Sequence, residues 1–66
     1  MIIQLNGQPR EVAGDMTVSG LIELLELTGK RLAVEINEDL VTRSEFDSHT
    51  LNDGDHVEIV QAIGGG

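Results

Sequence analysis

The sequence predicts an α+β domain in which one helix packs on one face of a mixed sheet of four to five strands. Three observations lead to this prediction. The segment 2–12 combines two β-prone runs around a turn signal. The segment 18–28 places apolar residues at helical spacing. The segments 32–37 and 56–63 alternate apolar and polar residues, as half-buried strands do.

Length and composition limit the chain to one small domain with an aliphatic core. It has 66 residues, 39% of them hydrophobic, with no cysteine and with Phe46 as its one aromatic residue. Without cysteine no disulfide can form, so the stability of this small domain has to come from packed Leu, Ile and Val side chains.

The charge is strongly acidic, with twelve Asp and Glu against four Lys and Arg and a formal net charge of −8. This argues against binding to nucleic acid or to an anionic membrane, since both need basic residues. It fits either an ordinary solvated surface or a partner with a basic face. No apolar run has the ~20 residues of a membrane span, and Met1 is not followed by a basic leader, so we expect a cytoplasmic protein.

The N-terminal half predicts a hairpin followed by a helix. Asn6-Gly7 tolerates positive φ angles and forms the turn, and Pro9 places the second strand at the sheet edge. Thr17 is the expected N-cap of a helix over 18–28, in which Leu24 widens the apolar stripe and after which Gly29 is the expected C′ residue.

The C-terminal half predicts three further strands. The alternation over 32–37 indicates a strand, and Leu40-Val41 is a very short returning strand. In the polar segment 42–50, Phe46 is the one residue expected to pack on the core, and one helical turn can form near 44–47. A turn at 52–55 then leads into the last strand, 56–63. This order predicts a β-grasp, ubiquitin-like architecture, with strands on either side of the helix able to lie parallel. We expect a single domain at 1–63 and a flexible glycine tail at 64–66.

The sequence contains no recognisable catalytic or metal-binding pattern. The serines lack a nucleophile-elbow context, and no phosphate-binding loop is present. His49 and His56 are expected at the surface, and Asp53 and Asp55 are explained by turn chemistry rather than by calcium. We therefore expect a protein that is not itself an enzyme, with no bound cofactor and no metal.

The remaining feature is the run Gly64–Gly66, directly after the last predicted strand. One interpretation is a frayed terminus or an appended remnant. The other is a slender tail on a rigid base that enters a partner's slot, since three extended residues reach ~10 Å. Glycine suits a terminus whose carboxylate is activated by ATP as an acyl-adenylate, because it adds neither bulk nor a Cβ constraint in a narrow channel.

The chain resembles the thiamine-biosynthesis sulfur carrier family (ThiS) over its whole length. The resemblance rests on Thr17-Val18 opening an apolar helix, on Asn52-Asp53-Gly54-Asp55 before the last strand, and on the final Gly65-Gly66. It implies that Gly66 is adenylated by an E1-like adenylyltransferase, which consumes ATP. Sulfur from a cysteine desulfurase-type persulfide then makes a thiocarboxylate, which thiazole synthase receives.

The resemblance also implies how the chain meets its partners. Gly64 and Gly65 are expected to enter the partner with the reactive Gly66. Family members dock through an apolar sheet surface beside the tail, and the candidates here lie on two strands of the predicted sheet: Val60, Ala62 and Ile63, with Val41 and Leu40 nearby. We expect a monomer when the chain is free.

Two other functions stay open from the sequence. The small subunit of molybdopterin synthase shares the fold, the Gly-Gly end and the thiocarboxylate, but is usually longer and richer in aromatic residues. A non-catalytic β-grasp binding module, similar to TGS domains, would carry an inert tail.

Overall fold

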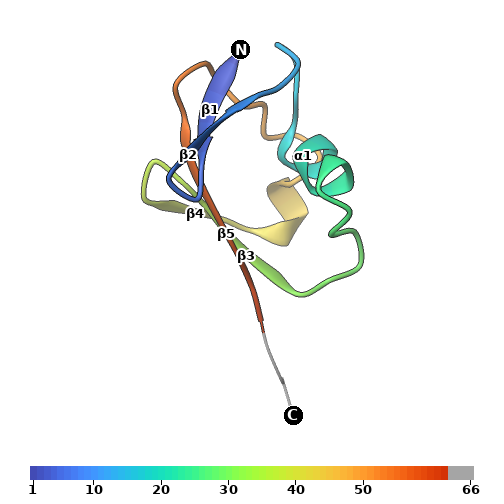
Figure 1. Cartoon of the computed structure of the whole chain (residues 1–66). Coiled ribbons are helices and arrows are strands. Elements are labelled where there is room, and N and C mark those ends of the chain that lie inside the picture. Colours follow the sequence, from blue (N-terminus) through green and yellow to red (C-terminus); the bar gives the residue numbers. More distant parts are fainter. Residues whose placement is uncertain (63–66) are drawn as a thin grey trace.

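A computed structural model describes residues 1–62 of the chain. The elements follow in the order β1 (Ile2–Leu5), β2 (Gln8–Glu11), α1 (Val18–Leu24), β3 (Leu32–Ile36), β4 (Asp39–Val41), the 3-10 helix η1 (Arg43–Glu45) and β5 (His56–Gln61). The strands form one mixed sheet in the order β2-β1-β5-β3-β4, with α1 and η1 on the same face (Figure 1). This arrangement confirms the predicted β-grasp fold. None of the helices in this part of the chain is long and apolar enough to cross a membrane.

The last strand, β5, occupies the centre of the sheet. It pairs in parallel with β1, where Gln4 lies opposite His56, and antiparallel with β3, where Leu32 lies opposite Gln61. The parallel pair therefore joins the first and last strands. The strands that flank the helix, β2 and β3, run in the same direction, as the sequence allowed, but they are not neighbours in the sheet. The chain therefore leaves the sheet from its central strand, which pairs with β1 near its start and with β3 along its length.

Both hairpins turn through residues with positive φ, as two-residue turns of type I′ require. Asn6 and Gly7 have φ angles of 49° and 83° between β1 and β2. Asn37 and Glu38 have φ angles of 53° and 72° between β3 and β4. The predicted edge position of β2 is confirmed, and Pro9 lies opposite Gln4 in that outermost strand, where a missing backbone N–H is tolerated.

The helix is shorter than the sequence predicted. Thr17 caps its N-terminus by accepting a hydrogen bond from the Gly20 backbone N at 3.1 Å, as expected. At the other end the chain turns at Glu26, which has a φ of 60°, so the helix stops at Leu24 and not at 28. Leu27 N donates to Ile22 O and Glu26 N donates to Glu23 O, the two bonds of a Schellman motif.

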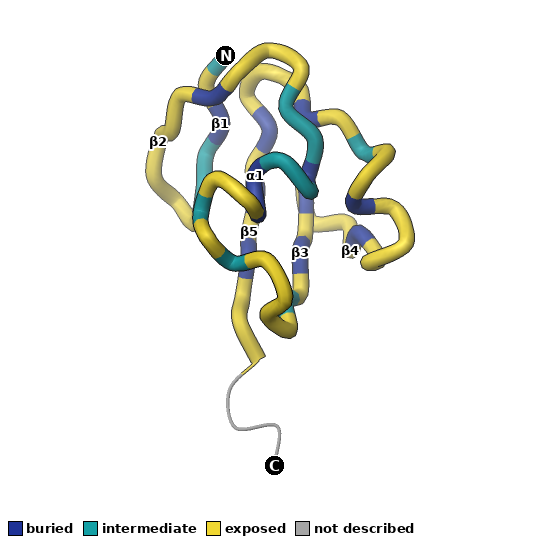
Figure 2. Tube along the Cα trace, turned by 90° about the vertical axis from the view of Figure 1, so that its right-hand side faces the viewer, coloured by how far each residue is buried: buried dark blue, intermediate teal, exposed yellow. Residues whose placement is uncertain are grey.

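The core lies between the helix and the inner face of the sheet (Figure 2). Gly20 allows α1 to lie close to the preceding loop, since a Cβ there would come within 2.9 Å of Met16 Sδ. Leu24 is 48% exposed and so does not widen the buried stripe. The buried apolar side chains come from every layer of the fold: Ile3, Val12, Val18, Leu21, Ile22, Val34, Ile36, Val41, Phe46, Leu51, Val57 and Ile59.

Candidate functional site

The candidate site is the end of the molecule at which β5 finishes, together with the outer face of the sheet beside it. Gly64, Gly65 and Gly66, and Ile63 of the predicted docking surface, lie outside the residues that the structure describes. What the structure provides is the base from which they leave. At that base the Ala62 backbone N donates a hydrogen bond to Arg31 O at 2.9 Å, one residue beyond the Leu32–Gln61 pair. The base is thus held to β3 up to the last described residue.

The outer face of the sheet next to this base is apolar. Val60 is 61% exposed and lies opposite Ala33, which is also exposed. These two residues line a shallow hollow with Ala62, Leu32 and Arg31. The predicted positions Val60 and Ala62 are therefore both on the exposed face. Ala33 belongs to the same surface and was not singled out from the sequence, because its opposition to Val60 depends on the register of β3 and β5.

Val41 does not lie on this surface, which corrects the sequence-based assignment. Its side chain is only 5% exposed and belongs to the core, opposite Val34. The neighbouring Leu40 points the other way and is 66% exposed. Side chains alternate between the two faces of a strand, so a shift of one position exchanges core and surface. In β4 the exposed apolar residue is Leu40.

Two carboxylates separate Leu40 from the apolar hollow. Glu35 lies opposite Leu40 in β4 and opposite Glu58 in β5. Like charges directly opposite each other on neighbouring strands destabilise a sheet slightly. The outer face therefore has an apolar part near the end of β5 and an acidic part towards the β3–β4 turn, where Glu38 and His56 border the same surface.

Hydrogen bonds from side chains hold the start and the middle of β5 in place. At its start, the Asp55 carboxylate is buried and accepts from Asn37 Nδ2 at 3.0 Å and from Asn52 N at 2.8 Å. In its middle, Asn6 Oδ1 accepts from Ile59 N at 2.9 Å. The predicted turn role of Asp55 is confirmed, whereas the tie between Asn37 and Asp55 joins two turns that are distant in the sequence.

The remaining candidates from the sequence have structural or surface positions. Asp53 Oδ1 accepts from Ile2 N at 2.8 Å, which ties the 52–55 turn to β1. His56 is exposed, and His49 is partly buried and not simply at the surface. Within residues 1–62, no group of three or more His, Cys, Asp or Glu lies close enough together to hold a metal ion.

The carboxyl group of Glu45 has a shifted pKa. The pKa of Glu45 is lowered from its ordinary value of 4.5, first because its carboxylate accepts a hydrogen bond from the Thr42 hydroxyl and second because it accepts one from the Thr42 backbone N. The two bonds to Oε1 measure 2.8 and 3.1 Å. These bonds cap the N-terminus of η1, and so Glu45 is a capping residue of this short helix.

Comparisons with known proteins agree with this architecture. The model of the ThiS family matches residues 3–66. The sulfur carrier protein ThiS of Escherichia coli is 35% identical over 66 residues, which cover all of both chains. A thiazole synthase of Paramagnetospirillum magneticum is 39% identical over the 66 residues of this chain, which span only 20% of that protein. The crystal structure of the thiamine biosynthesis protein (ThiS) from Geobacter metallireducens superposes with a TM-score of 0.85, at 35% identity and with full coverage of both chains. This chain belongs to the ThiS family.

Proposed function

We propose that this chain, a sulfur carrier of thiamine biosynthesis, holds its sulfur on the carboxyl carbon of Gly66. The full-length match to the E. coli sulfur carrier protein ThiS is the observation that carries the proposal. The chain has no cysteine, so it has no thiol on which sulfur could be carried. A carrier in which the backbone carboxyl group reacts accounts for both facts. In this role the chain is a cosubstrate and not a catalyst.

The proposed chemistry needs an activating partner. A carboxylate oxygen of Gly66 attacks the α-phosphorus of ATP in an E1-like adenylyltransferase, and pyrophosphate leaves. A persulfide sulfur, drawn from a cysteine desulfurase-type donor, attacks the acyl carbon and displaces AMP. A thiol then attacks the cysteine sulfur of the donor in the resulting acyl disulfide, so that a disulfide forms between the thiol and the donor and the thiocarboxylate is released on Gly66. ATP is consumed by the partner and is not a cofactor of the carrier.

Glycine at 64–66 supports insertion of the end of the chain into such a partner. Four residues follow Ala62, and at full extension they reach about 13 Å. Without side chains, the last three place no bulk against the walls of a narrow channel. The base of this segment is the end of β5, which is paired with β3. This pairing limits the directions from which the last residues can approach the reacting nucleotide.

Thiazole synthase is the proposed recipient of the sulfur. The thiazole synthase of P. magneticum contains a segment similar to all of this chain, so the two kinds of unit occur together in one polypeptide there. In separate chains they have to meet through a surface. We assign that surface to the exposed apolar patch made of Ala33, Val60 and Ala62.

The central test is the intact mass of the carrier. The purified chain is incubated with ATP, its cognate adenylyltransferase and a persulfide donor. We expect first the adenylate and then a product with one oxygen replaced by sulfur. No adenylate and no sulfur in the product would overturn the proposal. The chain lacking Gly66 serves as the control, with adenylation lost and thermal stability nearly unchanged.

A second experiment tests the docking patch. Val60→Asp places a charge on the exposed face, and we expect it to raise the KM for the carrier in the partner reactions without lowering its melting temperature. Leu24→Asp is the matched control, because Leu24 is also exposed but lies on the helix. Equal effects of the two substitutions would remove the special role of the patch.

The molybdopterin alternative differs in the pathway that it serves. The relatives named ThiS and thiazole synthase favour the thiamine pathway. Removal of the gene is expected to create a requirement for thiamine or its thiazole part. Loss of molybdenum-dependent enzyme activity, with normal growth in the absence of thiamine, would instead support the alternative.

A further inference from the structure

Three of the four basic residues of this acidic chain lie together at the end where β5 finishes. Lys30 and Arg31 directly precede β3, which runs antiparallel to β5. The pairing of Leu32 with Gln61 brings them beside Ala62, whose backbone N donates to Arg31 O. Both basic residues are exposed.

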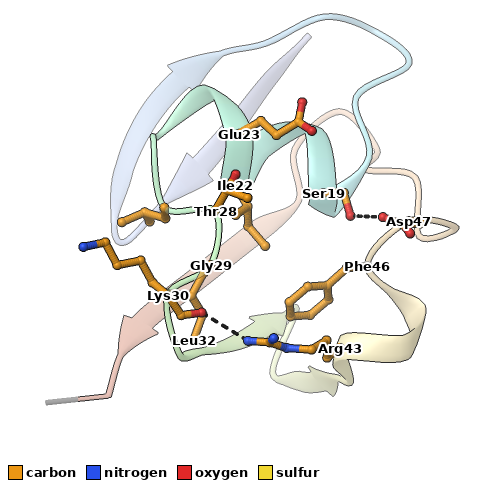
Figure 3. Close-up of a pocket in the computed structure, with 11 residues that line it drawn as sticks. Ser19, Ile22, Glu23, Thr28, Gly29, Lys30, Leu32, Arg43, Phe46 and Asp47 are labelled. Carbon is orange, nitrogen blue, oxygen red and sulfur yellow. Dashed lines mark hydrogen bonds between the residues drawn. The ribbon is translucent and has the colours of Figure 1, made fainter. Parts of the chain in front are cut away.

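Arg43 joins them from the other side of β3. It opens η1 two residues after Val41, which pairs with Val34, and is therefore level with the start of β3. Its guanidinium Nη2 donates a hydrogen bond to Lys30 O at 3.1 Å (Figure 3).

Arg43 and Lys30 line one hollow with Leu32 and Phe46, and the carboxylates Glu23 and Asp47 lie on the side of this hollow that faces the helix. Asp47 is hydrogen-bonded to Ser19. We call Lys30, Arg31 and Arg43 the cationic collar.

The collar contrasts with the charge of the molecule as a whole. The fourth basic residue, Arg10, lies in β2 at the opposite edge of the sheet, and the chain carries twelve carboxylates. In physiological salt, charges are screened over about 8 Å, so a partner at this end senses mainly the charges near the contact. The hydrogen bond of Arg43 fixes part of the collar in advance, which reduces the entropy lost on binding.

We propose that the cationic collar docks on an acidic protein surface that surrounds the entrance of the adenylating partner's channel for residues 63–66. This inference rests on the proposed function, since the collar lies on the β3 side of the base from which the segment that enters the partner leaves. Nucleic acid is a poorer fit, because a long polyanion would run along the rest of a body with a net charge of −8. The reactive carboxyl group lies up to about 13 Å beyond Ala62, so the collar faces the entrance and not the nucleotide.

The test compares four substitutions that change the net charge equally. Lys30→Gln, Arg31→Gln and Arg43→Gln remove collar charges, and Arg10→Gln is the matched control. The dissociation constant for the cognate adenylyltransferase is measured without ATP at low and high salt, with a melting temperature for each variant. We expect each collar substitution to weaken binding about twofold to fivefold, and Arg10→Gln to change it by less than about 1.5-fold. The triple collar variant should lose at least about tenfold and most of the salt dependence.

The outcomes that overturn the docking of the collar differ from those that overturn the proposed function. Equal losses in Arg10→Gln and the collar variants would mean that net charge alone matters. Unchanged or tighter binding of the folded triple variant would show that no acidic surface meets the collar. If the wild-type chain binds with the predicted pattern but is never adenylated, the proposed function fails and the collar stands. If adenylation occurs and the triple variant binds normally, the collar fails and the function stands. A wild-type chain that does not bind contradicts both.

Discussion

The side-chain amide of Asn6 pairs with the backbone of Ile59 as a neighbouring strand would. Its Oδ1 accepts from Ile59 N at 2.9 Å and its Nδ2 donates to Ile59 O at 3.3 Å. The backbone N of Asn6 donates to Val57 O at 2.8 Å, so the amide continues the parallel ladder after β1 has turned away. One residue therefore both forms the first turn and supports the strand that leads to the tail.

Substitution of Asn6 by glycine separates these two roles. Asn6→Gly keeps the positive φ but leaves both polar groups of Ile59 without their partner. We expect a loss of about 2 kcal/mol in the free energy of unfolding and faster hydrogen exchange at the Ile59 amide. Gln8→Ala, an exposed change in the same hairpin, should alter neither. A stable Asn6→Gly protein with a protected Ile59 amide would contradict the role of the side chain.

The two faces of β4 predict opposite responses at adjacent positions. Val41→Ala removes buried methyl groups from the core and should destabilise the protein by about 2 kcal/mol in urea unfolding. Leu40→Ala should change the stability by less than about 0.5 kcal/mol, because Leu40 is mostly exposed. The reverse ranking would mean that the register of β3 and β4 is shifted by one residue.

Glu26 is a site at which glycine should stabilise the protein. It occupies the left-handed C′ position of the helix, with a φ of 60°, and there a Cβ costs about 1 kcal/mol. Glu26→Gly is expected to raise the free energy of unfolding by roughly that amount. Glu23→Gly, the same change inside α1, should lower it by about 1 kcal/mol. Destabilisation by both changes would show that the helix continues past Leu24.

The hydrogen bonds of Glu45 predict a contribution to stability that depends on pH. Its pKa is lowered in the folded protein, because the bonds from Thr42 favour the charged carboxylate. Its contribution is therefore present above the ordinary pKa of 4.5 and is lost as the pH falls through the lower folded value. We expect the difference in unfolding free energy between the wild type and Glu45→Gln to shrink below pH 4.5. A difference that stays constant down to pH 3 would contradict this assignment.

Much of the local structure follows from the sequence because its causes are local. The Asn6-Gly7 turn, the Thr17 cap and the alternation over 32–36 each depend on residues within a few positions of one another. The end of the helix was harder to predict, because Gly29 provides a conventional signal and Glu26 does not. The Schellman bonds that stop the helix place Leu27 against the core, and packing outweighs the cost of the left-handed Glu26.

Part of the candidate site could also be predicted, because the residues in question lie in a segment with a clear local pattern. Val60 and Ala62 lie in the strand whose alternation is plain, and both are exposed as expected. Val41 was misplaced because two adjacent apolar residues in a three-residue strand do not define which face is buried. Ala33 and the collar residues were missed because their positions beside the end of β5 depend on pairing between distant segments.

The sequence by itself determined the class of fold, the elements and the absence of a cysteine on which sulfur could be carried. These depend on residue type and on short-range spacing, which set backbone preferences and hydrophobic periodicity. The tertiary structure decided that β5 lies between β1 and β3, that Leu40 and not Val41 is exposed, and that Arg31 lies beside Ala62 and Arg43 beside Lys30. The physical reason is strand register, which is selected by burial of the whole core and not by any single segment.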